Sequence, residues 1–168
     1  QMIKEGILKN PRVDRMFGQH VFPDLESGQV GFCPGKYMAS TDELYLNIQG
    51  KGGHAALPEK NKNPITVAAA LIQELYSHFD KEKNRPSVFS IGFVSGNGST
   101  NIIPDNVKLM GTFRCMDEEF RHYSHKHMLA ISDNIAQYNN IKIDFEIRKG
   151  YPFLENDKEL TEKAIFYA

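Results

Sequence analysis

Residues 43–49 read ELYLNIQ, and this stretch governs how the middle of the chain is interpreted. Leu44, Leu46 and Ile48 alternate with Glu43, Tyr45, Asn47 and Gln49, which is the period of two typical of a strand with one buried face. The glycine-rich segment 50–58 follows and is predicted to be a loop. The sequence therefore begins a folded unit with a half-buried strand.

Equally clear patterns run outward from this strand. They predict a helix over 63–79, strands over 87–94 and 107–114, a helix over 117–138 and a strand over 141–148. Asn63 and Asp117 are good N-caps, and Pro64 suits a first helical position. The order β-α-β-β-α-β over residues 40–151 predicts an α+β two-layer sandwich of the ferredoxin-like kind, with two helices on one face of an antiparallel sheet.

The two ends of the chain have a different character. Residues 1–8 are interpreted as the last turns of a helix, and Asp157 is predicted to cap a helix near the other end. Residues 13–17 and 29–32 are short candidate strands. We interpret residues 1–39 as part of a second, catalytic domain and residues 152–168 as the start of the return to it.

Composition excludes several classes of protein. The 168 residues carry 20 Lys and Arg against 21 Asp and Glu, a formal charge of -1, so nothing favours nucleic acid or an anionic membrane as partner. The longest apolar run, Val67–Ile72, is far below the ~18 residues that a membrane helix needs. Two cysteines form no disulfide framework or Cys-built zinc site. We expect a cytoplasmic protein.

Four polar residues are candidates for chemistry, each with a simpler alternative. His54 follows Gly52-Gly53 on a loop, where functional residues concentrate, but it could be only a surface histidine. His20 precedes a proline turn and is either a hydrogen-bonded surface residue or a metal ligand. Asn101 is typical of a turn former, and Arg114 of a surface ion pair. His122 and His125 are predicted to lie on a solvated helix face.

Five segments, taken together and in this order, resemble the M20 family of metallopeptidases and amidohydrolases. They are MIKEG from Met2, FGQHVFPDLESGQVGFCPG from Phe17, MASTDELYLNIQGKGGHAALP from Met38, NPITVAAALIQEL from Asn63 and NIIPDNVKLMGTFR from Asn101. The most similar branch contains hippurate hydrolases, N-acyl-amino-acid amidohydrolases and N-acetyldiaminopimelate deacetylases. The resemblance covers essentially the whole chain.

The resemblance implies a role for each candidate residue. His20 corresponds to a ligand of two divalent metal ions, usually zinc, in the catalytic domain. His54 corresponds to a catalytic histidine of the inserted lid that stabilises the oxyanion, typically in the partner subunit. Asn101 and Arg114 correspond to lid residues that bind the substrate's carboxylate or carbonyl. The implied activity is cleavage of the amide bond of N-acyl amino acids or small peptides by a homodimer joined through the lid.

Other family residues have no counterpart in these 168 residues. The remaining metal ligands and the glutamate that serves as general base are expected outside them, and Gln19 stands where Leu is common. This chain alone is therefore expected to be inactive. Two alternatives stay open, a stand-alone ferredoxin-like binding or assembly module and a catalytically dead relative. The acyl group and the amino acid released are not specified by these residues.

Overall fold

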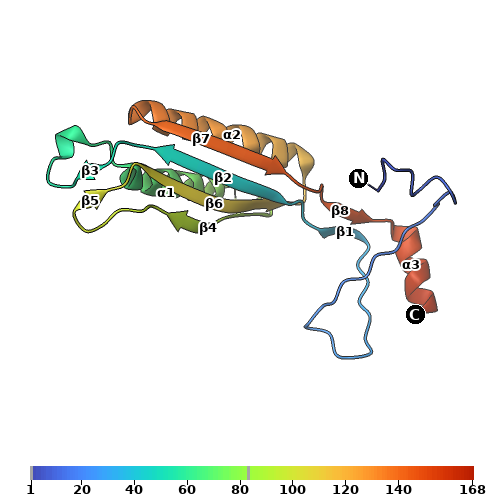
Figure 1. The fold of residues 1–168 in the computed structure, drawn as a ribbon. Coiled ribbons are helices and arrows are strands. Elements are labelled where there is room, and N and C mark those ends of the chain that lie inside the picture. Colours follow the sequence, from blue (N-terminus) through green and yellow to red (C-terminus); the bar gives the residue numbers. More distant parts are fainter. Residues whose placement is uncertain (1, 83) are drawn as a thin grey trace. The chain divides into compact units, whose positions relative to one another are not determined.

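The computed structural model describes residues 2–82 and 84–168. The chain forms two compact units, one made of the residues up to Phe32 with Ala168, the other of Cys33–Tyr167. All helices and strands assigned in the described residues belong to the second unit (Figure 1).

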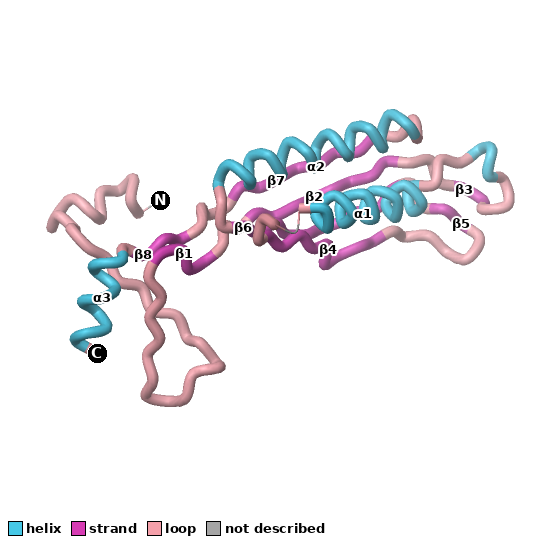
Figure 2. The backbone as a smooth tube through the Cα atoms, turned by 180° about the vertical axis from the view of Figure 1, so that it is seen from behind, coloured by secondary structure: helices cyan, strands magenta, loops and turns pink. Residues whose placement is uncertain are grey.

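The centre of the second unit is a four-stranded antiparallel sheet in the order β4-β6-β2-β7. Its strands are β2 (Asp42–Gln49), β4 (Ser87–Ser95), β6 (Asn106–Cys115) and β7 (Lys142–Lys149). Helices α1 (Pro64–Lys81) and α2 (Glu118–Tyr138) cover one face of the sheet (Figure 2). This arrangement confirms the predicted α+β sandwich with its β-α-β-β-α-β order.

The core lies between this sheet and the helices. Leu44, Leu46 and Ile48 of β2 face it and are almost wholly buried, as the alternation in the sequence predicts. Both predicted N-caps form, since Asn63 accepts from the backbone N–H of Ile65 and Asp117 from that of Phe120. The opposite face of the sheet carries the polar members of the same alternation.

A two-stranded ribbon stands at one end of the sandwich. Strand β1 (Gly35–Met38) pairs with β8 (Leu154–Asn156), and α3 (Lys158–Tyr167) follows β8. The side chain of Asp157 accepts from Leu160 N–H at 2.7 Å, which confirms the predicted cap. The chain crosses between ribbon and sandwich twice, at 39–41 and at 150–153.

A second small pairing stands at the other end of the sandwich. The strands β3 (Gly53–His54) and β5 (Ile102–Ile103) pair antiparallel, and the 3₁₀ turn η1 (Pro58–Lys60) lies in the same loop as β3. Figure 1 shows β3 and β5 at the end of the sheet away from β1 and β8. The sequence predicts neither strand, because two residues show no periodicity.

Three predictions for the N-terminal residues are wrong. Residues 2–8 form turns instead of a helix, with Gly6 at φ +86° and its N–H bonded to Ile3 O. Residues 13–17 and 29–32 form no strand. Segments this short need tertiary partners to become regular, and the first strand of the structure, β1, forms where β8 supplies that partner. Residue 1 lies outside the described residues.

No helix in the described ranges combines the length and the apolar character that crossing a bilayer would require.

Candidate functional site

His54 lies where the loop after β2 meets the loop before β6. Gly53 pairs with Ile103, and His54 pairs with Ile102. The backbone at Gly53 has φ +151°, and a Cβ there would come within 2.5 Å of the Asn61 side chain. This position therefore requires glycine, and the Gly-Gly-His sequence is explained by backbone conformation as well as by close approach.

The loop that carries His54 is fixed by hydrogen bonds. Asn61 Nδ2 donates to the carbonyl oxygens of His54 at 2.8 Å and of Leu57 at 3.0 Å. The carboxylate of Asp105 accepts from Gly52 N–H at 2.9 Å. The loop is therefore held from within and from the segment before β6, although the His54 side chain itself is exposed.

The imidazole of His54 has a defined donor and acceptor side. Ala56 N–H donates to His54 Nδ1 at 3.1 Å, so Nδ1 carries a lone pair. In the neutral ring the proton is then on Nε2, which is the donor that the ring offers to a ligand. An exposed N–H at a fixed loop position suits the stabilisation of a developing negative charge.

Asn101 lies beside His54, although 47 positions in the sequence separate them. Its carbonyl oxygen accepts from Ala55 N–H at 2.9 Å, and its side-chain Oδ1 accepts from Ser99 Oγ at 3.1 Å. With Oδ1 engaged, the Nδ2 amide is the part of the side chain that could donate to a ligand. The structure thus brings together two of the predicted site residues.

Arg114 does not join them. It lies near the end of β6, opposite Val88 of β4, and its side chain is exposed on the face of the sheet away from the helices. Asn106 begins the same strand and follows Asp105, whose carboxylate binds Gly52 in the His54 loop. The structure therefore separates Arg114 from His54 and Asn101 by the length of β6.

His20 belongs to the N-terminal unit. Its side chain is exposed, and Nδ1 lies 2.6 Å from the carbonyl oxygen of Val21. A ring whose Nδ1–H donates to a carbonyl keeps its Nε2 lone pair for a metal, a common arrangement among metal-binding histidines. Within the residues that the structure describes, no group of three or more His, Cys, Asp or Glu side chains could hold a metal ion.

A buried charged cluster at the ribbon end of the sandwich has no signal in the sequence. Asp42 and Arg121 are both fully buried and form an ion pair, and His125 Nε2 lies 2.7 Å from Asp42 Oδ2. Burial acts to raise the pKa of Asp42, but hydrogen bonds from Arg121, His125 and Gly150 outweigh it and hold that pKa below its usual value. The predicted solvated position of His125 is therefore wrong, because this partner lies far away in the sequence.

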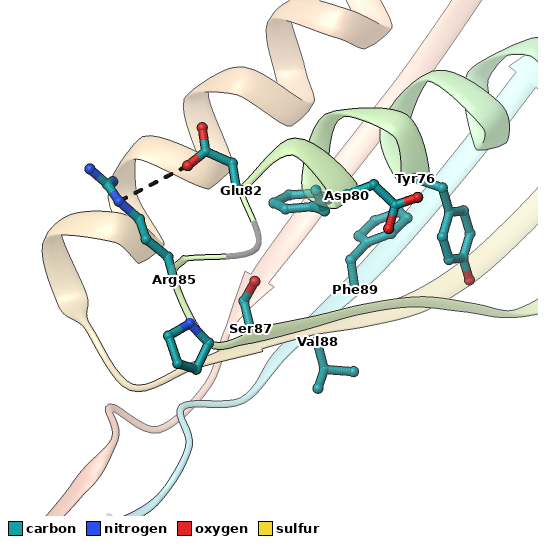
Figure 3. A pocket seen from close by; sticks show the side chains of 9 residues that line it. Tyr76, Asp80, Glu82, Arg85, Ser87, Val88 and Phe89 are labelled. Atoms are coloured by element: carbon teal, nitrogen blue, oxygen red, sulfur yellow. Dashed lines mark ion pairs between the residues drawn. The ribbon is translucent and has the colours of Figure 1, made fainter.

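One hollow of the second unit is lined neither by the His54 loop nor by the Asp42–Arg121 cluster. Tyr76, Phe79, Arg85, Val88 and Phe89 are among the residues that line it, between the end of α1 and the start of β4 (Figure 3). Tyr76 packs edge-on against Phe89, and its hydroxyl accepts from Ile91 N–H at 3.1 Å. None of the predicted site residues lies there.

Residues 41–139 match the family model of the peptidase dimerisation domain, M20_dimer. The chain belongs to the M20 peptidase family. The matched part of this M20 chain contains the β-α-β-β-α portion of the sandwich, which is all but its last strand, together with His54, Asn101 and Arg114.

Relatives of this M20 chain include two curated bacterial enzymes. N-acetyl-L-cysteine deacetylase of Bacillus subtilis is 32% identical, covering 96% of this chain and 39% of the relative. Hippurate hydrolase of Campylobacter jejuni is 32% identical, and the match covers 97% of this chain and 43% of the relative. The chain thus spans about two-fifths of the length of these relatives.

A solved structure of the M20 family also resembles this chain. The Bacillus subtilis YXEP protein, described as a dinuclear metal-binding peptidase of the M20 family, superposes with a TM-score of 0.72 at 29% identity. The match covers 97% of this M20 chain and 40% of the other. The likeness therefore extends beyond the dimerisation domain to the flanking residues.

Proposed function

We propose that this chain is the lid and adjoining part of a metal-dependent amidohydrolase that cleaves the amide bond of N-acyl amino acids or small peptides. The observation that carries the proposal is the pairing of β3 with β5, which sets a donor-bearing His54 beside Asn101 in an M20 dimerisation domain. The names of the relatives, a deacetylase and a hippurate hydrolase, support this class of substrate.

In this proposal His54 and Asn101 act on the reacting carbonyl. When an amide is attacked, its carbonyl oxygen becomes an oxyanion, and a donor aimed at that oxygen stabilises the transition state more than the substrate. The Nε2–H of His54 and the Nδ2 amide of Asn101 are donors of the required kind. Arg114 would hold the substrate's carboxylate with two parallel hydrogen bonds, which a lysine cannot match.

His20 is proposed as one ligand of two divalent metal ions, with zinc as the expected metal. The ring orientation fits a ligand, but the described residues alone do not complete a site, so the other ligands would come from elsewhere in the protein. Such ions, when bound, polarise the amide carbonyl and make a water nucleophilic. The description of the Bacillus subtilis YXEP protein as a dinuclear metal-binding peptidase supports two ions in the whole protein.

The separation of Arg114 from His54 bears on which subunit each residue serves. Arg114 lies eight residues along β6 from Asn106, roughly 26 Å at the rise of an extended strand, and His54 lies beyond the Asn106 end. An N-acyl amino acid is much shorter than this. We therefore propose that each active site takes Arg114 from one chain and His54 with Asn101 from its partner.

The proposed homodimer forms along the edge strand β4. The exposed side chains of Val88, Phe93 and Val94 make this edge apolar, whereas the other edge strand, β7, exposes Lys142, Asp144, Glu146 and Arg148. Charged side chains protect a sheet edge from pairing, and an apolar edge invites it. The match to a dimerisation domain supports a second copy of this chain as the partner.

The division into residues 1–39, 40–151 and 152–168 remains part of the proposal. Large apolar side chains of the flanking parts are exposed, among them Phe17 and Val21 before the lid and Phe166 after it. Such surfaces are expected to be covered by the rest of a catalytic domain. We also propose a cytoplasmic location, which the unpaired thiols of Cys33 and Cys115 support.

The test uses the whole protein that carries this segment. It is assayed with N-acetyl amino acids and with N-benzoylglycine, beside His54→Ala and the control His122→Ala, which removes an exposed histidine of α2. We expect hydrolysis of at least one substrate, its loss in His54→Ala and its retention in His122→Ala. A folded protein with no hydrolysis of either class would favour a catalytically dead relative or a binding module.

A mixing experiment tests the sharing of sites. An equal mixture of His54→Ala and Arg114→Ala chains forms mixed dimers in which one hybrid site has both residues. The mixture is assayed at a substrate concentration far below the raised KM of Arg114→Ala, where neither variant alone has appreciable activity. If sites are shared, activity should recover to about one quarter of that of the unchanged protein, since half of the dimers are mixed and each has one whole site. If His54 serves its own chain, verified mixed dimers stay inactive.

A further inference from the structure

Both segments that connect the sandwich to the β1–β8 ribbon meet at one buried side chain. Arg121 of α2 donates through Nη2 to the carbonyl oxygens of Thr41 and Gly150, each at 3.2 Å. Thr41 lies in the segment entering the sandwich and Gly150 in the segment leaving it. A single guanidinium thus holds two backbone positions that are 109 positions apart in the sequence.

The carboxylate of Asp42 completes this arrangement. It accepts from Nε and Nη2 of Arg121, and its Oδ1 also accepts from Gly150 N–H at 3.2 Å. The remaining nitrogen, Nη1, donates to Glu118 at 2.9 Å. Every nitrogen of the guanidinium is therefore engaged, which is the condition under which a buried arginine is tolerated.

The two segments also bond directly to one another at this level. Gly150 N–H donates to Thr41 O at 2.9 Å, and Thr41 N–H donates to Tyr151 O at 3.1 Å. A Cβ at residue 150 would lie 2.3 Å from Thr41 O, so the close approach depends on glycine. The crossing therefore consists of two closely spaced segments of the chain, residues 40–42 and 149–151, which we call the neck. Arg121 packs against it.

We propose that Arg121 is a positioning residue that fixes the direction in which the β1–β8 ribbon leaves the sandwich. A buried ion pair is weak evidence for stability, because apolar residues of similar size often replace such a pair without loss. What apolar residues cannot do is donate hydrogen bonds to two carbonyl oxygens and a carboxylate at once. The inference goes beyond the proposed function, and it holds or fails for this chain whether or not amides are hydrolysed.

The proposal assigns a lesser role to the exposed contact nearby. Lys36 of β1 donates to Met116 O at 2.7 Å, and its ammonium lies 5.0 Å from the ring centre of Phe153. This lysine also joins the ribbon to the sandwich, but it binds one carbonyl from a flexible, solvated side chain. We expect its loss to affect the neck less than the loss of the Arg121 fork.

The first test is hydrogen exchange on the 168-residue chain, comparing Arg121→Lys with Arg148→Lys. Arg148 also binds a carboxylate with two nitrogens, Glu146 on β7, but touches neither connecting segment, so it is the matched control. Arg121→Lys should speed exchange at the amides of Thr41, Gly150 and Tyr151 by roughly 10- to 100-fold, as loss of a charged hydrogen bond implies. Core amides of β2 and β6 and the control should change much less.

A second variant covers the case in which Arg121→Lys does not fold. Asp42→Leu combined with Arg121→Met removes both charges at similar volume and should leave the sandwich folded. Residual dipolar couplings would then report the orientation of the ribbon relative to the sandwich. The couplings of the ribbon amides should no longer fit the alignment tensor that fits the sheet. Three results would overturn the proposal: unchanged neck exchange, exchange raised equally throughout the sandwich, or a larger effect from Lys36→Met than from Arg121→Lys.

Discussion

The side-chain amide of Asn61 donates to the carbonyl oxygen of His54 at 2.8 Å, and its oxygen fills the space that a side chain at residue 53 would need. Two residues seven positions apart thus set the backbone on which the imidazole stands. The hydrogen-bond donor that the proposed chemistry uses is therefore positioned by a residue that need not touch the substrate.

Replacing Asn61 with alanine should impair catalysis without unfolding the whole protein. The loop loses its bonds to the carbonyl oxygens of His54 and Leu57, so the imidazole samples wrong positions and kcat should fall by about tenfold. Asn139→Ala is the matched control, because Asn139 also donates to a carbonyl, that of Ile135 on α2. Equal loss in both variants would argue against a role specific to the His54 loop.

His54→Ala and Arg114→Ala should differ in the kinetic constant that they change. Removing an oxyanion donor typically lowers turnover by roughly 100- to 1,000-fold, so His54→Ala should lower kcat while KM and the melting temperature change little. Arg114→Ala should mainly raise KM, because its partner carboxylate is already present in the bound substrate. Steady-state kinetics on the whole protein would show the split, and a KM effect from His54→Ala alone would contradict the assignment.

A new charge on the β4 edge should weaken the dimer. In a two-fold interface each substitution occurs twice, so Val94→Lys places two lysines in an apolar contact and should raise the dissociation constant at least ~10-fold. Sedimentation measures this against Glu146→Lys, which adds a lysine to the opposite edge strand. A stronger effect from Glu146→Lys would place the interface on β7.

Stability should fall as the pH drops below the ordinary range of histidine. Burial lowers the pKa of His78, and the nearby His127 lowers it further, so the folded state favours the neutral ring. The unfolded chain binds the proton at pH values where the fold does not. The contribution of the neutral His78 to stability is therefore fully present above about pH 6.5 and is lost as the pH falls below it.

Urea unfolding at about pH 7.5 and about pH 5.5 would measure this loss. His78→Phe keeps the stack on His127, whose ring centre lies 5.1 Å away, but cannot be protonated, so it should reduce the difference between the two conditions. His122→Phe on the exposed side of α2 should leave the difference as it is. If His78→Phe has no effect, the acid sensitivity arises elsewhere.

The isolated 168-residue chain should hold no stoichiometric zinc. His20 alone offers one ligand nitrogen, and the described residues form no larger metal-binding group. Elemental analysis after dialysis should give the same low zinc content for the unchanged chain and for His20→Ala. One tightly held zinc ion per chain would show that a ligand set exists that neither the sequence nor the structure reveals.

Local patterns in the sequence are sufficient to specify the sandwich. Alternation in ELYLNIQ and its counterparts specifies strands with one buried face, and the Asn63 and Asp117 caps specify where α1 and α2 begin. Each of these signals depends only on neighbours within a turn or a strand. The family segments around His20, His54, Asn101 and Arg114 likewise identify the candidate residues from the order of amino acids alone.

Where those residues lie depends on contacts between elements. That Asn101 stands beside His54 while Arg114 lies at the far end of β6 follows from strand register, which pairs residues distant in the sequence. The buried contact of Asp42 with Arg121 has the same origin, because a carboxylate and a guanidinium 79 positions apart carry no periodic signal. Local patterns fix elements, whereas contacts between elements form only once the chain has folded and excluded water between them.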